Sequence, residues 1–134
     1  MNPETKFTNK VRKAWSITWP SMAIYKHSDR FNGGIADLHI VLAGGQTAWV
    51  EVKWVPSVAK KRKAGATDLQ VAFLEEHAER GVPSIVLVGT KLGFATYRIE
   101  DYDGYVHAAD LRDHIYLAEI IDEIFYGGVK RPHA

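Results

Sequence analysis

The sequence predicts a mixed α/β fold in which helices flank a central β-sheet. Helical and extended patterns follow one another in the order α-β-β-β-α-β-β-α, which is typical of a layered α/β structure. The chain has 134 residues, room for one compact domain, and we find no internal repeat or linker that divides residues 1–134. Hydrophobic residues make up 46% and charged residues 25% of the chain, which is sufficient for a packed core.

The N-terminal segment predicts a helix over residues 3–17. Asn2 is suited to cap this helix, and proline is favoured at the first helical position, where Pro3 stands. Apolar residues then recur at helical spacing. The helix should end before Pro20, because a proline disfavours helical geometry in the residue that precedes it.

Extended segments dominate the chain between the first helix and residue 60. Each is rich in β-branched or aromatic residues, and a glycine-containing segment marks a hairpin between the last two. We expect strands over residues 23–26, 35–42 and 47–55.

The length of the hairpin loop decides which side chains face each other. A two-residue loop would pair Asp37 with Val52, whereas a three-residue loop over residues 43–45 pairs Asp37 with Glu51. The three-residue loop also matches the apolar faces of the two strands, and Gly45 suits its left-handed position. The sequence therefore favours Asp37 and Glu51 as cross-strand neighbours.

The second half of the chain predicts a helix, two strands and a further helix. Residues 60–66 are polar, small and charged, so we expect a mobile loop there. Thr67 and Gln70 have the spacing of a capping box, which predicts a helix to about residue 80 that ends at Gly81. The remaining elements are expected at residues 84–88 (a strand buried on both faces), 94–99 (a strand) and 111–125 (a helix).

Composition excludes several classes of function. The chain has no cysteine, which excludes disulfide scaffolds, thiolate zinc sites, iron–sulfur clusters and cysteine nucleophiles. No apolar run approaches the roughly 18 residues of a membrane span. The first residues lack the apolar core of a signal peptide, so we expect a cytoplasmic protein with no membrane partner.

Charge is unevenly distributed along the chain. Residues 1–67 carry 11 Lys and Arg against 4 Asp and Glu, whereas residues 68–134 carry 6 against 12. This asymmetry indicates a basic surface that attracts a polyanion such as DNA, although many solvated faces are as basic. The candidates for DNA contact are Lys10, Lys13, Arg30, Lys60, Lys61, Arg62 and Lys63.

Three ionisable residues interrupt the apolar pattern of the hairpin strands. Two opposed carboxylates, Asp37 and Glu51, repel each other, and a divalent cation between them reverses the sign of that interaction. Lys53 lies two residues beyond Glu51 on the same strand face. Such a set is suited to metal-assisted phosphodiester hydrolysis. The alternative is a cross-strand ion-pair cluster on a solvated face.

These residues resemble the PD-(D/E)xK nuclease superfamily. The resemblance consists of Gly-Ile-Ala-Asp at residues 34–37, Glu-Val-Lys at residues 51–53 after a glycine hairpin, and Gln70 on the next helix. It is closest to the virus-type replication-repair (VRR-NUC) and Holliday-junction-resolvase branches and covers about residues 4–90. It implies an αβββαβ restriction-endonuclease-like core over about residues 3–90, to which residues 91–134 add a strand and an extra C-terminal helix.

The resemblance also implies roles for individual residues. Mg²⁺ or Mn²⁺ would be bound by Asp37, Glu51 and the carbonyl of Val52, and Lys53 would be the catalytic lysine. Glu4 is similar to the N-terminal glutamate that completes the metal site in this family, although an acidic residue is favoured in a first helical turn anyway. Gln70 resembles the polar residue of the family's second helix, with the capping box as the competing explanation. The proline that usually precedes the aspartate is alanine here.

The expected function is therefore that of a metal-dependent DNA endonuclease. Because the chain has no evident sequence-reading module, we expect selectivity for branched DNA, as in a Holliday-junction resolvase acting in DNA recombination or repair. Symmetric cleavage of a four-way junction requires two active sites, hence a homodimer. The resemblance suggests a viral setting. The alternatives are a general nicking or restriction-like nuclease and a non-catalytic DNA-binding protein.

Overall fold

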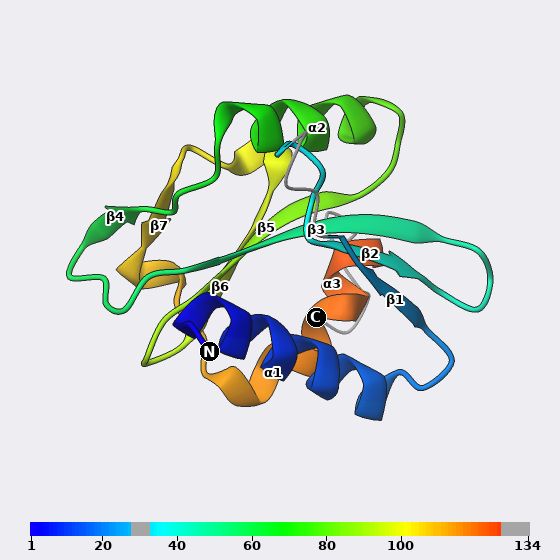
Figure 1. The fold of residues 1–134 in the computed structure, drawn as a ribbon, viewed down its shortest axis with the longest axis horizontal. Helices are drawn as coiled ribbons and strands as arrows, with labels where there is room; N and C mark the ends of the chain where they lie inside the picture. Colours follow the sequence, from blue (N-terminus) through cyan, green and yellow to red (C-terminus); the bar gives the residue numbers. More distant parts are fainter. Residues whose placement is uncertain (28–32, 127–134) are drawn as a thin grey trace.

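A five-stranded mixed sheet forms the centre of the protein in the computed structural model, which describes residues 1–27 and 33–126 (Figure 1). The strands lie in the order β1-β2-β3-β5-β6, and only the β3–β5 pair is parallel. The mixed sheet expected from the sequence is thereby confirmed. The strands are β1 (Ala23–Lys26), β2 (Leu38–Val41), β3 (Thr47–Trp54), β5 (Ser84–Gly89) and β6 (Phe94–Arg98).

The hairpin between β2 and β3 has the register that the sequence favours. Leu38 pairs with Val50 and Val41 with Thr47, which leaves residues 43–45 as a three-residue loop. Gly45 has a φ of +91°, a left-handed conformation that a side chain would strain. The β2 ladder is shorter than the expected segment, because only Leu38–Val41 takes part in it.

Helices cover both faces of the sheet. Figure 1 shows α2 (Asp68–Glu79) on one side and α1 (Pro3–Thr18) with α3 (Ile120–Tyr126) on the other. The core divides accordingly into two clusters of buried apolar residues, one under α1 and α3 and one under α2. The α2 helix connects the parallel strands β3 and β5, and β5 is buried along its whole length, as its apolar sequence predicts.

The caps expected at the two long helices are present. Asn2 Oδ1 accepts the Thr5 backbone N–H at 2.8 Å and so caps α1. At α2, Thr67 and Gln70 exchange the two hydrogen bonds of a capping box. Each cap satisfies backbone donors that the first helical turn leaves unpaired.

Residues 60–66 are only partly a loop, because three of them form a strand that the sequence did not predict. Lys61–Lys63 forms β4, which pairs antiparallel with β7 (Tyr105–His107) in a two-stranded ribbon beside the main sheet. The Lys61 amine lies 4.7 Å from the centre of the Tyr105 ring, a cation–π contact across the ribbon. Strand β7 lies in a segment for which the sequence predicted no element.

The C-terminal segment also differs from the expected continuous helix over residues 111–125. Arg112 forms a β-bridge with Phe94 instead of a helical turn. A 3₁₀ helix, η3 (His114–Glu119), then begins after Asp113, whose side chain accepts the Ile115 N–H at 3.0 Å. The α-helical part is α3 alone, and η1 (Ile99–Asp101) and η2 (Ala108–Asp110) complete the assignment.

Buried tryptophans fix the position of α1 against the C-terminal segment. Trp15 is fully buried and its indole N–H donates to the Leu117 carbonyl at 2.8 Å, while Trp19 donates to the Ala118 carbonyl at 3.0 Å. These contacts anchor the N-terminal helix on the sheet and so fix the side chains of its first turns. Within the described ranges, none of the helices is both long and apolar enough to span a membrane.

Candidate active site

The register of β2 and β3 brings Asp37 beside Glu51. Because Leu38 pairs with Val50, the next position along each strand places these two acidic residues opposite each other. The Asp37 backbone N–H donates to Glu51 Oε1 at 3.2 Å. The Asp37 carbonyl accepts the His27 N–H at 2.8 Å, which ties the end of β1 to the same point.

Strand β3 supplies the other contacts of this cluster. Side chains alternate along the strand, so Glu51 and Lys53 lie on one face and Val52 on the other. The Lys53 amine lies 3.3 Å from Glu51 Oε2. The Val52 backbone N–H donates to Asp37 Oδ2 at 2.9 Å, so the peptide of Val52 lies at the carboxylates although its side chain is in the core.

Glu51 is the most unusual side chain of the cluster. It is 0% exposed, and its Oε2 atom has no hydrogen-bond partner among the described residues, although the Lys53 amine is at ion-pair distance. Burial, reinforced by the neighbouring Asp37 carboxylate, raises the pKa of Glu51 to about 8 against the opposing effect of Lys53. The pocket therefore holds this carboxylate as an anion only at a free-energy cost.

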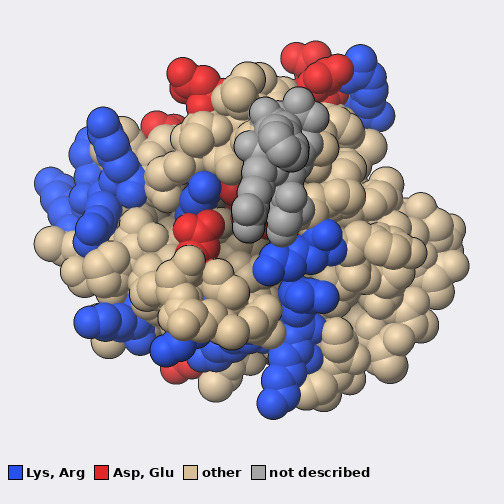
Figure 2. Space-filling model, viewed as in Figure 1, with Lys and Arg blue, Asp and Glu red and all other residues tan. Residues whose placement is uncertain are grey.

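A cavity of about 420 Å³ borders this cluster at Asp37. Asp37 lines it together with Glu4 from α1 and Gln70 from α2. Burial raises the pKa of Glu4, with a lowering contribution from Lys53 and a raising one from Asp37, so the three charges lie within electrostatic reach of one another. Figure 2 shows acidic and basic side chains meeting in the middle of this face.

Gln70 serves the helix cap and borders the cavity at the same time. Its side-chain oxygen accepts the Thr67 N–H at 2.9 Å, which completes the capping box. That hydrogen bond fixes the amide at the edge of the cavity, so the capping role and a place beside the cluster are compatible.

The described residues contain no preformed cluster of three or more His, Asp or Glu side chains that could hold a metal ion. What the structure brings together is a pair of carboxylates, Asp37 and Glu51, with the peptide of Val52 and the amine of Lys53. Glu4 borders the cavity without joining the pair. The candidate donor set is thus two carboxylates, which is the number that Mg²⁺ commonly takes from a protein.

None of the candidate DNA-contacting residues that the structure describes lines this cavity. Lys61, Arg62 and Lys63 are exposed on β4, and Lys60 precedes them. Figure 2 shows this concentration of positive charge at the left, where Figure 1 places β4. Lys10 and Lys13 are exposed on α1. Arg30 lies outside the described residues.

Sequence reasoning missed several residues that border the cavity. Thr5 and Thr8 line it from α1, and Lys26 and His27 line it from the end of β1. Thr8 lies one helical turn after Glu4, and this spacing could have indicated that the α1 threonines border the cavity. The approach of β1 depends on its pairing with β2, which the sequence of β1 alone does not indicate.

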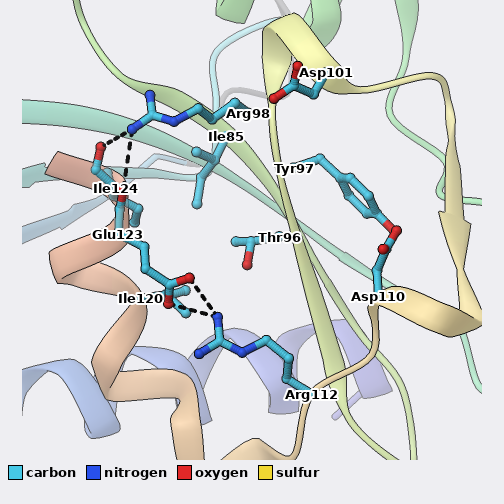
Figure 3. A pocket seen from close by; sticks show the side chains of 10 residues that line it. All are labelled: Ile85, Thr96, Tyr97, Arg98, Asp101, Asp110, Arg112, Ile120, Glu123 and Ile124. Carbon is cyan, nitrogen blue, oxygen red and sulfur yellow. Dashed lines mark hydrogen bonds and ion pairs between the residues drawn. The ribbon is translucent and has the colours of Figure 1, made fainter. Parts of the chain in front are cut away.

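A second cavity, of about 410 Å³, lies between β6 and α3 (Figure 3). Its two arginines, Asp110 and Glu123 pair with other side chains or with the backbone. Arg112 donates to both carboxylate oxygens of Glu123 at 2.9 and 2.7 Å, and Arg98 donates to the Ile124 carbonyl at 2.7 Å. These contacts hold α3 against the edge of the sheet, so we assign this cavity a structural role.

Comparison with known proteins identifies the fold. No protein-family model matches the sequence, and no curated protein matches it either. Among solved structures, the chain is similar to Hjc, a Holliday junction resolvase from the archaeal hyperthermophile Archaeoglobus fulgidus. The TM-score is 0.59 at 11% sequence identity, over 88% of this chain and 97% of that chain.

This similarity defines the class of fold. The chain has the mixed α/β fold of the archaeal resolvase, with helices on both faces of the five-stranded sheet. On that fold, half-buried Asp37, which directly precedes β2, and buried Glu51 of β3 form a pair of carboxylates with an adjacent lysine. Because identity is low, the similarity establishes the fold alone, and activity has to be argued from the carboxylate pair.

Proposed function

We propose that this protein is a Mg²⁺- or Mn²⁺-dependent DNA endonuclease of the PD-(D/E)xK type that cuts branched DNA. The observation that carries the proposal is the buried Glu51 carboxylate, which lies between Asp37 and Lys53 and whose Oε2 has an ion-pair contact with Lys53 but no hydrogen bond among the described residues. A fully buried acid without a full set of hydrogen bonds destabilises a fold, and a function is a reason for a protein to retain it.

The donor set fits a hard divalent cation. Asp37 and Glu51 are oxygen ligands from adjacent strands, and the Val52 peptide adjoins them. A divalent cation would offset the repulsion between the carboxylates and satisfy Glu51 Oε2. When bound, it would polarise the scissile phosphate and lower the pKa of an attacking water. Glu4, across the cavity, would act as an auxiliary ligand or hold a water.

The other residues would position the reacting groups. The Lys53 amine, 3.3 Å from Glu51 Oε2, would orient the attacking water and stabilise negative charge that develops on the phosphate. The Gln70 amide, fixed by its bond to the Thr67 N–H, would hold the water or a phosphate oxygen at the edge of the cavity.

Branched DNA is supported by fold and surface charge. The similar solved structure is that of a Holliday junction resolvase. The exposed cations of β4 are suited to backbone phosphates, which position DNA without reading its sequence. We therefore propose a cytoplasmic single-domain protein that acts as a homodimer, because symmetric cutting of a four-way junction needs two active sites. We propose that it acts in recombination or repair and belongs to the virus-type branch, on the sequence resemblance to the PD-(D/E)xK superfamily.

Cleavage of defined DNA substrates tests this function. Duplex, flap, splayed and four-way DNA are incubated with the protein in Mg²⁺, Mn²⁺ or EDTA. Asp37→Asn, Glu51→Gln and Lys53→Gln should each abolish metal-dependent cutting, while Glu76→Gln, an exposed carboxylate of α2, should leave it unchanged. Circular dichroism confirms that each variant folds.

Each other outcome contradicts a specific part of the proposal. Equal cutting of duplex and four-way DNA would contradict branch selectivity and favour a general nicking or restriction-like nuclease. DNA binding with no cleavage in either metal would contradict the nuclease and favour a non-catalytic DNA-binding protein.

A further inference from the structure

A third cavity lies beside the first turns of α1 on the side away from Glu4. Its volume is about 370 Å³, within the usual range for small-ligand sites. Pro3, Lys6, Phe7 and Lys10 line it from α1. At 3.6 residues per turn these four positions lie on the opposite side of the helix from the positions that line the active-site cavity.

Three lysines border this third cavity. Lys6 and Lys10 are one helical turn apart, and Lys91 approaches from the β5–β6 turn. All three are exposed, and none forms an ion pair within residues 1–27 and 33–126. Three like charges around one hollow repel one another, so the cavity attracts an anion.

Aromatic side chains make up most of the remaining lining, which also includes Pro3 and Thr90. The Trp54 and Phe7 rings have their centres 5.8 Å apart, and the His114 ring lies 5.9 Å from Phe7. His114 Nε2 donates to the Thr90 carbonyl at 2.8 Å, which fixes the imidazole ring at the wall of the cavity. The cavity thus combines aromatic surface with three amines.

A single unpaired nucleotide has the complementary chemistry. Its base offers a flat face for Trp54, and its phosphate offers negative charge for the lysines. Trp54 directly follows Lys53 along β3 and points to the opposite face of the sheet, so this cavity is lined by the residue next to Lys53 in the strand that also carries Glu51.

We propose that the cavity formed by Lys6, Lys10, Lys91 and Trp54 binds one unstacked nucleotide of the DNA substrate. This proposal rests on the proposed function and deepens it, because branch points supply unstacked bases and the interior of a duplex does not. Binding of that nucleotide would retain branched DNA while a neighbouring phosphate occupies the active-site cavity.

Binding of a short oligothymidylate to the full chain, measured by fluorescence anisotropy in EDTA, tests the proposal without cleavage. Trp54→Leu should weaken binding roughly tenfold, and Trp54→Phe, which keeps an aromatic face, should restore most of it. Lys91→Gln should reduce the slope of log affinity against log salt by about 0.7. Arg80→Gln, at the far end of α2, is the matched single-charge control and should change nothing.

A triple variant extends the test to all three amines. The combined substitutions Lys6→Gln, Lys10→Gln and Lys91→Gln should lower that slope by about 2. Thermal unfolding of each variant establishes that it is folded. Trp54 packs on Phe7, so Trp54→Leu could be unstable. In that case, Trp54→Phe and the lysine substitutions test the nucleotide site.

Two results would overturn the proposal. One is an unchanged affinity in Trp54→Leu and an unchanged salt slope in the triple variant. The other is displacement of the oligothymidylate by inorganic phosphate at the same concentration that thymidine monophosphate requires. That result would show that the cavity binds only an anion. Cleavage by the unmodified protein is assayed separately, so failure of the proposed nuclease and failure of this nucleotide site give different results.

Discussion

Glu51→Gln should make the protein more stable at neutral pH in the absence of divalent cations. The folded state raises the pKa of Glu51 from its usual value of 4.5 to about 8, chiefly through burial. Between these values the unfolded chain has released the proton and the folded protein has kept it. The folded state binds more protons there, so the free energy of unfolding falls as pH rises through this window.

The size of the effect follows from the pKa difference. Each unit of difference corresponds to about 1.4 kcal/mol, so the shift to about 8 costs the wild-type protein roughly 5 kcal/mol once Glu51 is fully ionised. Between about pH 5 and about pH 8 the loss is on the order of 3 to 4 kcal/mol. Glutamine has the same shape and no titration, so the variant escapes this loss.

Urea unfolding of both proteins in EDTA at several pH values measures the difference directly. The gap in free energy of unfolding between Glu51→Gln and wild type should widen steadily as pH rises. The comparison cancels the titration of the histidines and of the acids remote from Glu51, which both proteins share. A gap that stays constant with pH would refute the reasoning, because Glu51 would then titrate alike in the folded and unfolded states.

Three further predictions concern the cavity, the ribbon and the hairpin. Glu4→Gln should lower cleavage roughly tenfold without abolishing it, since Glu4 borders the carboxylate pair and does not join it; a loss as complete as that of Asp37→Asn would contradict an auxiliary role. Gln at all four positions 60–63 should weaken duplex binding and reduce its salt slope by about 3 to 4, and an unchanged slope would remove the ribbon from the DNA interface. Gly45→Ala should lower the free energy of unfolding by about 1 kcal/mol, because φ is +91° there. Equal stability in urea would show that the loop relaxes.

Local patterns predicted the parts of the structure that depend on local chemistry. The register of the hairpin followed from two constraints that agree, a glycine in the left-handed position of the loop and the matching of apolar faces. The capping box of Thr67 and Gln70 is likewise specified within four residues. This is why the proximity of Asp37 and Glu51 could be predicted from the sequence.

Long-range contacts account for what the sequence did not predict. Strand β4 consists of charged residues, and its partner β7 lies more than forty positions later in the chain. Likewise, Arg112 pairs with Phe94 instead of starting a helix. The full burial of Glu51 depends on β5 and the flanking layers closing over it, which no pattern within β3 reveals.

Binding of Mn²⁺, measured by electron paramagnetic resonance, tests most directly whether Asp37 and Glu51 share one divalent cation. The wild-type protein is expected to bind Mn²⁺ at a site that Mg²⁺ can occupy in competition. Asp37→Asn and Glu51→Gln should each lose that site, and Glu76→Gln should keep it. Binding that survives both substitutions, or no binding by the wild-type protein, would contradict the account.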